Sequence, residues 1–401
     1  MQQTSKQPTT SAWPQWNLQM LWRAFLDVLP AMLAPLVGIV VAFVLIILIL
    51  DWQGADPKVA WDYVYDGTLA TAAKRADLVA FWMPLALTSF GLVLTFTAGL
   101  WNIGVEGQIV MGAIGATWAI RLFAENETPL WGLEMGRTGI LITSFVFAAV
   151  AGALWSSVAA MLKTRGGVNE IFGGVALNFI AQTFNMYLVS NGGPWQPAGS
   201  RATETARFPR IAWLPSMEKY RRLSPTTIYI TAAAFVLVAL IMYISRWGLQ
   251  LRAQGKNEKS AFLLGVRTQR NAVAAMAACG GMAGVAGAFR VLAPDVVKLT
   301  ATPSGGIGFQ AILVVLLAAT SIVLVPFVSF AFAVLSKGGQ RMENGFQWDF
   351  DITLDRSLVR VLQSTVVLMV VLAFGARNRF FPPRSAQPVS DDEEMETVDL
   401  T

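Results

Sequence analysis

Long apolar runs alternate with short polar segments along most of this chain. The runs are about 20 residues long, which is the length a helix needs to cross the hydrocarbon core of a bilayer. They are continuous rather than alternating, unlike the strands of a membrane β-barrel. We therefore predict an all-α, polytopic membrane protein with about ten transmembrane helices. The predicted spans lie near residues 30–50, 81–100, 103–123, 138–162, 168–190, 226–245, 270–292, 307–320, 322–337 and 357–376.

One boundary between spans and both ends of the chain need separate interpretation. The apolar stretch from Ile307 to Leu335 could form two short spans or one long kinked span. Residues 1–29 are predicted to be a cytoplasmic N-terminus. From Trp13 to Leu29, apolar residues recur at helical spacing, which predicts an amphipathic helix lying on the membrane surface. Residues 30–376 would form the transmembrane domain. Residues 377–401 carry six acids near their end and are predicted to be a disordered, cytoplasmic tail.

The distribution of basic residues predicts the orientation. Lys and Arg concentrate in short cytoplasmic loops, and here they concentrate in residues 246–270, in the turn after residue 162 and after residue 376. With ten spans, these segments and both termini are cytoplasmic. Residues 191–225 then fall outside, although they carry six bases and two acids. We expect that positive loop to meet a partner outside the cell.

Composition excludes several kinds of chemistry. Among 401 residues, 55% are hydrophobic, 14% are charged, none is histidine and Cys279 is the single cysteine. This composition leaves no imidazole metal site, no Ser-His-Asp triad and no intrachain disulfide. No G-x-x-x-x-G-K-[ST] sequence occurs, so any work driven by ATP must come from a partner.

The run from Trp101 to Gln108 places a carboxylate and two amides between apolar segments. A charged side chain deep in a bilayer costs about 2.5–3.5 kcal/mol or more. One interpretation is a cap and lock, with Asn102 as the N-cap of the third span and Glu106 favoured by the helix dipole. The other is that Glu106 and Gln108 line a solute path.

A second polar group lies on the predicted fifth span. Asn178, Gln182 and Asn185 are spaced so that they share one helix face. Amides both donate and accept hydrogen bonds, so such a stripe suits a neutral solute rich in hydroxyl groups or a heterocyclic solute. The alternative is hydrogen bonding between helices. Glycines form small-x-x-x-small patterns in the third and seventh spans and predict close helix packing; they are Gly104, Gly107, Gly112, Gly115, Gly280, Gly281, Gly284 and Gly287.

Four blocks, in order, resemble the permease subunits of ABC importers for nucleosides, which belong with ribose-type and branched-chain amino acid permeases. Residues 99–108 closely resemble the family signature GLFNIGVEGQ, and residues 168–181 resemble NEVI…LNYIA. Residues 248–257 are similar to the loop motif G-x-x-LRA-x-G-x-N, and residues 307–312 to GF-x-AI. The first block favours nucleosides. The chain departs from the family at Thr97, at Glu258 and in the apolar segment 318–325. The signature positions are Asn102, Gly104, Gly107, Asn169 and Glu170.

The resemblance implies a permease subunit in the bacterial cytoplasmic (inner) membrane, without catalytic residues or a metal site of its own. Its partners would be a cytosolic ABC ATPase, a second, dissimilar permease or another copy of this chain, an extracytoplasmic solute-binding protein and membrane lipid, but not nucleic acid. ATP and Mg²⁺ would be bound by the ATPase, and this chain would bind no cofactor. The ATPase would dock on residues 246–270. Within this segment, the family's motif assigns the docking role to Arg252, Ala253, Gly255, Ala261 and Gly265.

Three alternatives remain open from the sequence. The substrate could be a simple sugar of the ribose or galactose type. An ion-coupled secondary transporter would need a titratable group in the membrane, for which Glu106 is the candidate. A membrane-embedded enzyme would need grouped charges at one membrane face, and Asp349, Asp351 and Asp355, expected in an outer loop, are the only such group.

Overall fold

The structure, a computed structural model, describes residues 56–124, 136–217 and 222–350 and a few isolated positions: 44, 45, 47, 48, 51, 52, 54, 220, 364, 365, 368, 369 and 372. The chain divides into two compact units, residues 50–363 and residues 1–49 with 364–401. The helices below belong to the first unit. The amphipathic helix expected before residue 30, the acidic tail and nearly all of the spans expected at 30–50 and 357–376 lie outside the described residues.

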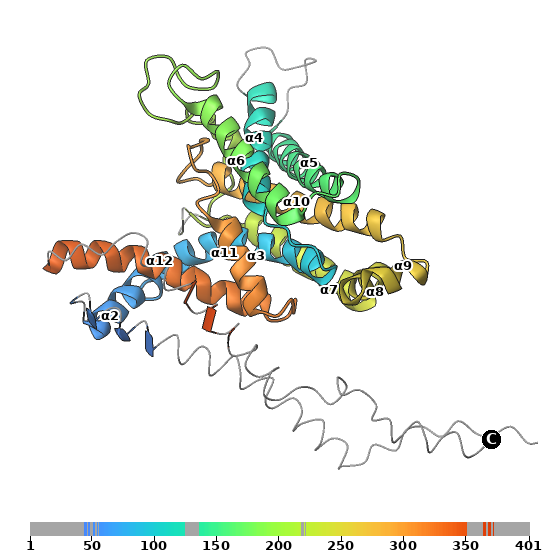
Figure 1. Cartoon of the computed structure of the whole chain (residues 1–401). Coiled ribbons are helices and arrows are strands. Elements are labelled where there is room, and N and C mark those ends of the chain that lie inside the picture. Colours follow the sequence, from blue (N-terminus) through green and yellow to red (C-terminus); the bar gives the residue numbers. More distant parts are fainter. Residues whose placement is uncertain are drawn as a thin grey trace, which may run out of the picture. The chain divides into compact units, whose positions relative to one another are not determined.

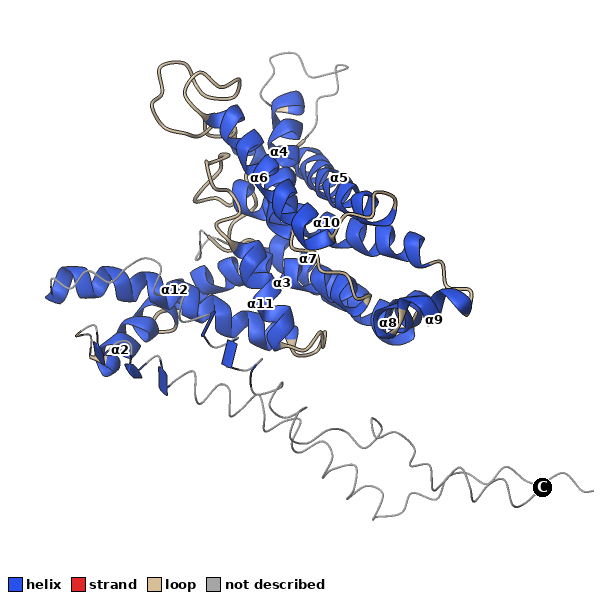
Figure 2. Cartoon of the chain, viewed as in Figure 1, coloured by secondary structure: helices blue, strands red, loops and turns tan. Residues whose placement is uncertain are grey.

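Regular structure in the described ranges is helical, as predicted, apart from two isolated β-bridges (Figures 1 and 2). The helices, in chain order, are α2 (Pro57–Thr68), α3 (Ala72–Thr97), α4 (Val105–Phe123), α5 (Arg137–Thr164), α6 (Glu170–Val189), the 3-10 helix η2 (Arg210–Ala212), α7 (Pro225–Ile244), α8 (Arg246–Lys256), α9 (Glu258–Leu263), α10 (Thr268–Leu292), α11 (Ile307–Leu317) and α12 (Val325–Phe350).

Each apolar run predicted within the described ranges contains a helix. Four of them, α3, α5, α7 and α10, are both long and apolar enough to cross a membrane, which identifies an integral membrane protein. The expected number of about ten spans is not confirmed. Helix α3 begins nine residues before the predicted span, because the side chain of Thr71 accepts a hydrogen bond of 3.3 Å from the N–H of Lys74 and caps the helix.

The stretch from Ile307 to Leu335 forms two helices rather than one kinked helix. Helices α11 and α12 are separated by a turn in which Ala319 and Thr320 both have positive φ, 47° and 60°. That conformation is uncommon for residues other than glycine. It interrupts the helix at the boundary between the predicted spans 307–320 and 322–337, where Thr320 and Ser321 break the apolar sequence.

Helix α12 is longer than predicted. It continues to Phe350, so Asp349 lies in its last turn and the expectation of an outer loop there was wrong. Asp351 and Asp355 lie outside the described residues. The extension packs on α2, a helix that the sequence did not predict: a Cβ added to Gly338 would lie 2.5 Å from a methyl group of Val64.

Glycines bring α4, α5 and α10 into close contact, as the small-x-x-x-small patterns predicted. A Cβ on Gly284 would lie 2.1 Å from the carbonyl oxygen of Ala148 in α5, and a Cβ on Gly112 would lie 2.2 Å from Cα of Gly284. Gly281 is different, because its nearest neighbour would be 3.7 Å away, an ordinary contact. The close approach therefore depends on particular glycines rather than on the whole stripe.

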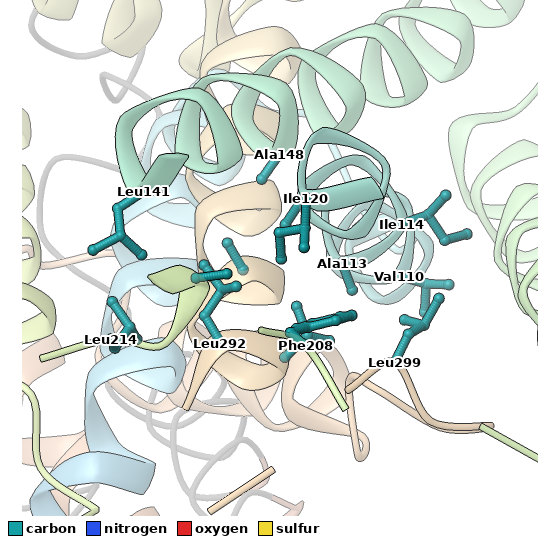
Figure 3. Close-up of a cluster of buried hydrophobic side chains, with 14 of the residues drawn as sticks. Val110, Ala113, Ile114, Ile120, Leu141, Ala148, Phe208, Leu214, Leu292 and Leu299 are labelled. Carbon is teal, nitrogen blue, oxygen red and sulfur yellow. The ribbon is translucent and has the colours of Figure 1, made fainter. Parts of the chain in front are cut away.

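The apolar core continues beside this contact. Figure 3 shows Val110, Ala113 and Ile120 of α4 facing Leu292 of α10 and Phe208 of the long loop between α6 and α7. These side chains are 0–2% exposed. The core therefore joins that loop to the helices and fixes the ends of α4 and α6, on which the polar residues of the sequence analysis lie.

Candidate functional site

The predicted N-cap at Asn102 is wrong. Helix α4 begins at Val105, its N-cap is Gly104, and no side chain caps it. Asn102 is instead fully buried and makes two side-chain hydrogen bonds with Gln108: its Nδ2 donates to Gln108 Oε1 at 3.1 Å, and Gln108 Nε2 donates to its Oδ1 at 2.8 Å. Asn102 Nδ2 also lies 3.1 Å from Sγ of Cys279 in α10. This pair locks the chain reversal between α3 and α4 onto α10.

Glu106 caps a different helix. Its Oε1 accepts hydrogen bonds from Ser304 Oγ at 2.5 Å and from the N–H of Gly306 at 3.0 Å, and its Oε2 accepts one from the N–H of Gly308 at 2.7 Å. Gly306 is the N-cap of α11. The carboxylate therefore satisfies backbone donors that the first turn of α11 leaves free, and it sits at the positive ends of both α4 and α11.

This contact requires glycine on the α11 side. A Cβ on Gly308 would lie 2.6–2.8 Å from Oε2, Cα and N of Glu106. Gly306 has a φ of 82°, which an L-residue with a side chain rarely adopts. The glycines bring the two helix N-termini together, and the carboxylate then bridges them.

The three amides of α6 each donate to a neighbouring segment. Asn178 Nδ2 donates to the carbonyl oxygen of Ile103 at 2.8 Å, and its Oδ1 accepts from the N–H of Gly107 at 2.7 Å. Gln182 Nε2 donates to the carbonyl oxygen of Ala301 at 2.6 Å. Asn185 Nδ2 lies 3.0 Å from the carbonyl oxygens of both Thr300 and Ala301. The stripe therefore bonds α6 to its neighbours.

Part of the same stripe borders a cleft of about 460 Å³. The cleft is formed by α4, α6, the segment before α11 and α11 itself; its lining residues are Glu106, Val110, Val175, Asn178, Phe179, Gln182, Thr302, Ser304, Gly305, Gly306 and Phe309. Phe179 and Phe309 are 71% and 50% exposed. Because the oxygens of Glu106 are already engaged, the cleft offers aromatic faces, amides and hydroxyls more than a free charge.

The structure thus brings together three of the five predicted path residues, Glu106, Asn178 and Gln182. Gln108 and Asn185 are at most 1% exposed and do not border the cleft, because their side chains are turned into helix contacts. Sequence reasoning missed Phe179, Phe309 and Ser304. Both phenylalanines stand in blocks that carry the resemblance, and Phe179 directly follows Asn178, so their position could have suggested them.

The signature residues Asn169 and Glu170 begin α6. Asn169 is its N-cap and accepts from the N–H of Ile171 at 2.9 Å. Glu170 forms an ion pair of 2.7 Å with Lys163 at the end of α5. These residues stabilise the turn between α5 and α6 and do not border the cleft.

Within residues 246–270, the two short helices α8 and α9 precede the start of α10. Gly255 fits against the end of α3, where a Cβ would lie 2.0 Å from the carbonyl oxygen of Thr97. Ala261 is buried, Ala253 is half-buried, and Gly265 has a φ of 86° just after α9. Arg252 is exposed, as are Leu263 and Leu264, at 83% and 82%.

Among the residues that the structure describes, no group of three or more acids and cysteines is placed to hold a metal ion.

Comparisons with known proteins show the family of this chain. The family model described as "Branched-chain amino acid transport system / permease component" matches residues 75–373. A glucose ABC transporter permease protein of Haloferax volcanii is 30% identical over 79% of this chain and 80% of its own length. A guanosine ABC transporter permease protein of Bacillus subtilis is 26% identical, with coverage of 86% and 94%. A nucleoside ABC transporter permease protein of Lactococcus lactis is 22% identical, with coverage of 85% and 91%.

Proposed function

Because this chain belongs to the permease family of branched-chain amino acid transport systems, we propose that it is the transmembrane permease subunit of an ABC importer for nucleosides. Partner subunits hydrolyse ATP with Mg²⁺, and this chain performs no covalent chemistry. It works in the bacterial cytoplasmic membrane with both termini on the cytoplasmic side. Relatives that transport guanosine and other nucleosides align over most of the chain.

The observation that carries the proposal of a substrate path is the composition of the cleft. Phe179 of α6 and Phe309 of α11 present aromatic faces, on which a nucleobase can stack at about 1–3 kcal/mol per base. The hydrogen bond to Ala301 is the only one that the Gln182 side chain makes with the described residues, so its Oε1 is available to a base or a ribose hydroxyl. Ser304 and Thr302 add hydroxyl groups. Glu106, Asn178 and Gln182 are thus the path residues that we retain.

A sugar is the second candidate, because the glucose permease of Haloferax volcanii is 30% identical to this chain. A hexose or pentose would use the same amides and hydroxyls. It would gain less from two exposed aromatic rings, because it has no planar base to stack. The substrate class therefore depends on whether the phenylalanines contribute to transport.

Uptake of labelled guanosine and labelled glucose by the complete transporter in proteoliposomes tests this proposal. Phe179→Ala should raise the KM for the nucleoside about tenfold or more, which corresponds to the loss of one stacked base. Phe172→Ala is the matched control, because Phe172 is 75% exposed on the same helix and does not border the cleft. Uptake of glucose alone would overturn the nucleoside assignment. Uptake driven by an ion gradient without ATP would overturn the ABC mechanism in favour of a secondary transporter.

The same family membership supports a proposal for the partners. We propose that α8 and α9 dock on the ATPase through Arg252, Ala253, Gly255, Ala261 and Gly265. The support is that α9 exposes Leu263 beside basic residues while Gly255 anchors α8 to the end of α3. Residues 191–225, with their excess of bases, would receive the solute-binding protein. A second permease, dissimilar or identical, would complete the path.

A further inference from the structure

A second cavity, of about 60 Å³, shares no lining residue with the substrate cleft. It is bordered by the N-terminal half of α3, the start of α7, the end of α10 with the loop that follows it, and the middle of α12. Five charged residues line it: Asp77, Arg222, Arg290, Asp295 and Lys337. Three bases and two acids leave one positive charge in excess.

The two acids are already engaged by one of the bases. Arg222 Nη1 lies 2.9 Å from Asp77 Oδ2, and its Nε lies 3.6 Å from Asp295 Oδ2. Arg290 donates through Nε to the carbonyl oxygen of Pro303 at 3.2 Å. Lys337 places its Nζ 5.2 Å from the ring centroid of Phe81. Among the described residues, neither Arg290 nor Lys337 has a carboxylate within the 4.0 Å of an ion pair.

A buried hydroxyl lines the same cavity without a partner. Ser224 is 2% exposed, and its Oγ makes no hydrogen bond. It is also the N-cap of α7, where its side chain does not perform the capping that serine usually provides. Ser224 and Thr227, at the start of this 20-residue helix, therefore line a cavity that also contains two cations without a carboxylate partner. The helix dipole makes this end of α7 positive.

Arg290 and Lys337 are half-buried. A cation that is partly removed from water is costly unless it is paired, and a buried polar atom is costly unless it is hydrogen-bonded. One small anion would satisfy the cations, the hydroxyl and the helix terminus together, as anions bound at helix N-termini do. We propose that this cavity is a binding site for a monovalent halide, chloride under ordinary conditions, held by Arg290, Lys337 and Ser224 Oγ. The ion would join α3, α7, α10 and α12 at this end of the bundle.

The site is independent of the proposed transport function and is tested by stability. The full-length chain, purified in detergent, is melted in sodium chloride and in sodium gluconate at equal sodium concentration, because gluconate is too large for the cavity. With chloride at about ten times its Kd, the melting temperature should exceed that in gluconate by about 2 °C. Ser224→Ala and Lys337→Gln should each remove most of this difference. Lys298→Gln is the control, because Lys298 pairs with Glu204 away from the cavity and should leave the difference intact.

Bromide provides a direct readout that does not depend on any variant folding. Crystals grown in bromide should show an anomalous difference peak between Arg290 and Lys337. Equal melting temperatures in chloride and gluconate would overturn the proposal. So would a chloride effect that both cavity variants retain, or bromide-grown crystals that lack a peak in the cavity.

Discussion

The carboxylate of Glu106 accepts a hydrogen bond of 2.7 Å from the backbone N–H of Gly308, a residue 202 positions further along the chain. The contact joins the N-terminus of α4 to the N-terminus of α11 and forms one wall of the cleft. A charge that looks costly in an apolar sequence is therefore held by three hydrogen-bond donors and two helix dipoles.

This contact predicts the effect of Glu106→Gln. The amide keeps the shape of the side chain but replaces one acceptor oxygen with a donor, which then faces the N–H groups of α11. We expect the free energy of unfolding to fall by about 2 kcal/mol, measured as a loss of thermal stability of the purified chain. Glu204→Gln is the matched control. It removes only a surface ion pair with Lys298, which should be worth less than about 1 kcal/mol. Equal losses in the two variants would contradict the capping role.

The glycine contacts of α10 predict a difference within one helix. Gly284→Ala should destabilise the protein by about 1–3 kcal/mol, because its Cβ would overlap the carbonyl oxygen of Ala148 and force α5 and α10 apart. Gly281→Ala should be neutral or slightly stabilising, because its Cβ meets only an ordinary contact and alanine favours the helix. Thermal melts of the two variants side by side check this. A stable Gly284→Ala protein would show that the helices pack differently.

Substitution of Gln108 and substitution of Gln182 should have different effects on stability and transport. Gln108→Ala leaves the fully buried Asn102 without its main partner, so we expect a loss of about 1–3 kcal/mol in stability. The KM of the folded transporter should not change, because Gln108 does not border the cleft.

Gln182→Ala should instead raise KM by about threefold to tenfold through the loss of a hydrogen bond to substrate. The bond to Ala301 disappears as well, so its stability is measured in parallel. Uptake kinetics from the complete transporter give the KM values. A raised KM in Gln108→Ala with an unchanged one in Gln182→Ala would reverse the assignment of the two residues.

The proposed docking role of α8 predicts the effect of Arg252→Glu. Reversing the charge of this exposed arginine should reduce the ATPase that co-purifies with the permease about tenfold, because a partner carboxylate would then face a like charge. Membrane insertion should be unaffected. Arg201→Glu, at an exposed position of the long loop between α6 and α7, is the control and should retain the ATPase. Undiminished co-purification of Arg252→Glu would exclude a docking role for this residue.

Much of the architecture could be predicted because it depends on local pattern. The length of each apolar run predicts helices such as α5 and α7. The spacing of Gly280 and Gly284 predicts a close helix contact. The ends of the helices were harder to predict from the sequence. The sequences of helix α2 and of the second half of α12 are polar enough to predict loops. Both segments are helical because they pack on each other.

The candidate site was predicted in part. Glu106, Asn178 and Gln182 stood out because polar groups in apolar segments need partners. The sequence could not distinguish Gln108, which turns toward Asn102, from Gln182, which reaches the cleft. Nor could it place Ser304, Gly306 and Gly308 beside Glu106, since nothing local connects residues about 200 positions apart.

The sequence by itself determined that this is a helical membrane protein, which family it resembles and which polar residues need an explanation. Those conclusions depend on hydrophobic length, residue spacing and motif order, all of which are properties of short segments. Only the tertiary structure decided which partner satisfies each polar group. Hydrogen-bond partners are chosen by the packing of distant helices: that packing made Asn102 a lock rather than a cap, made Glu106 a cap for α11, and left Phe179, Phe309 and Gln182 facing the cleft.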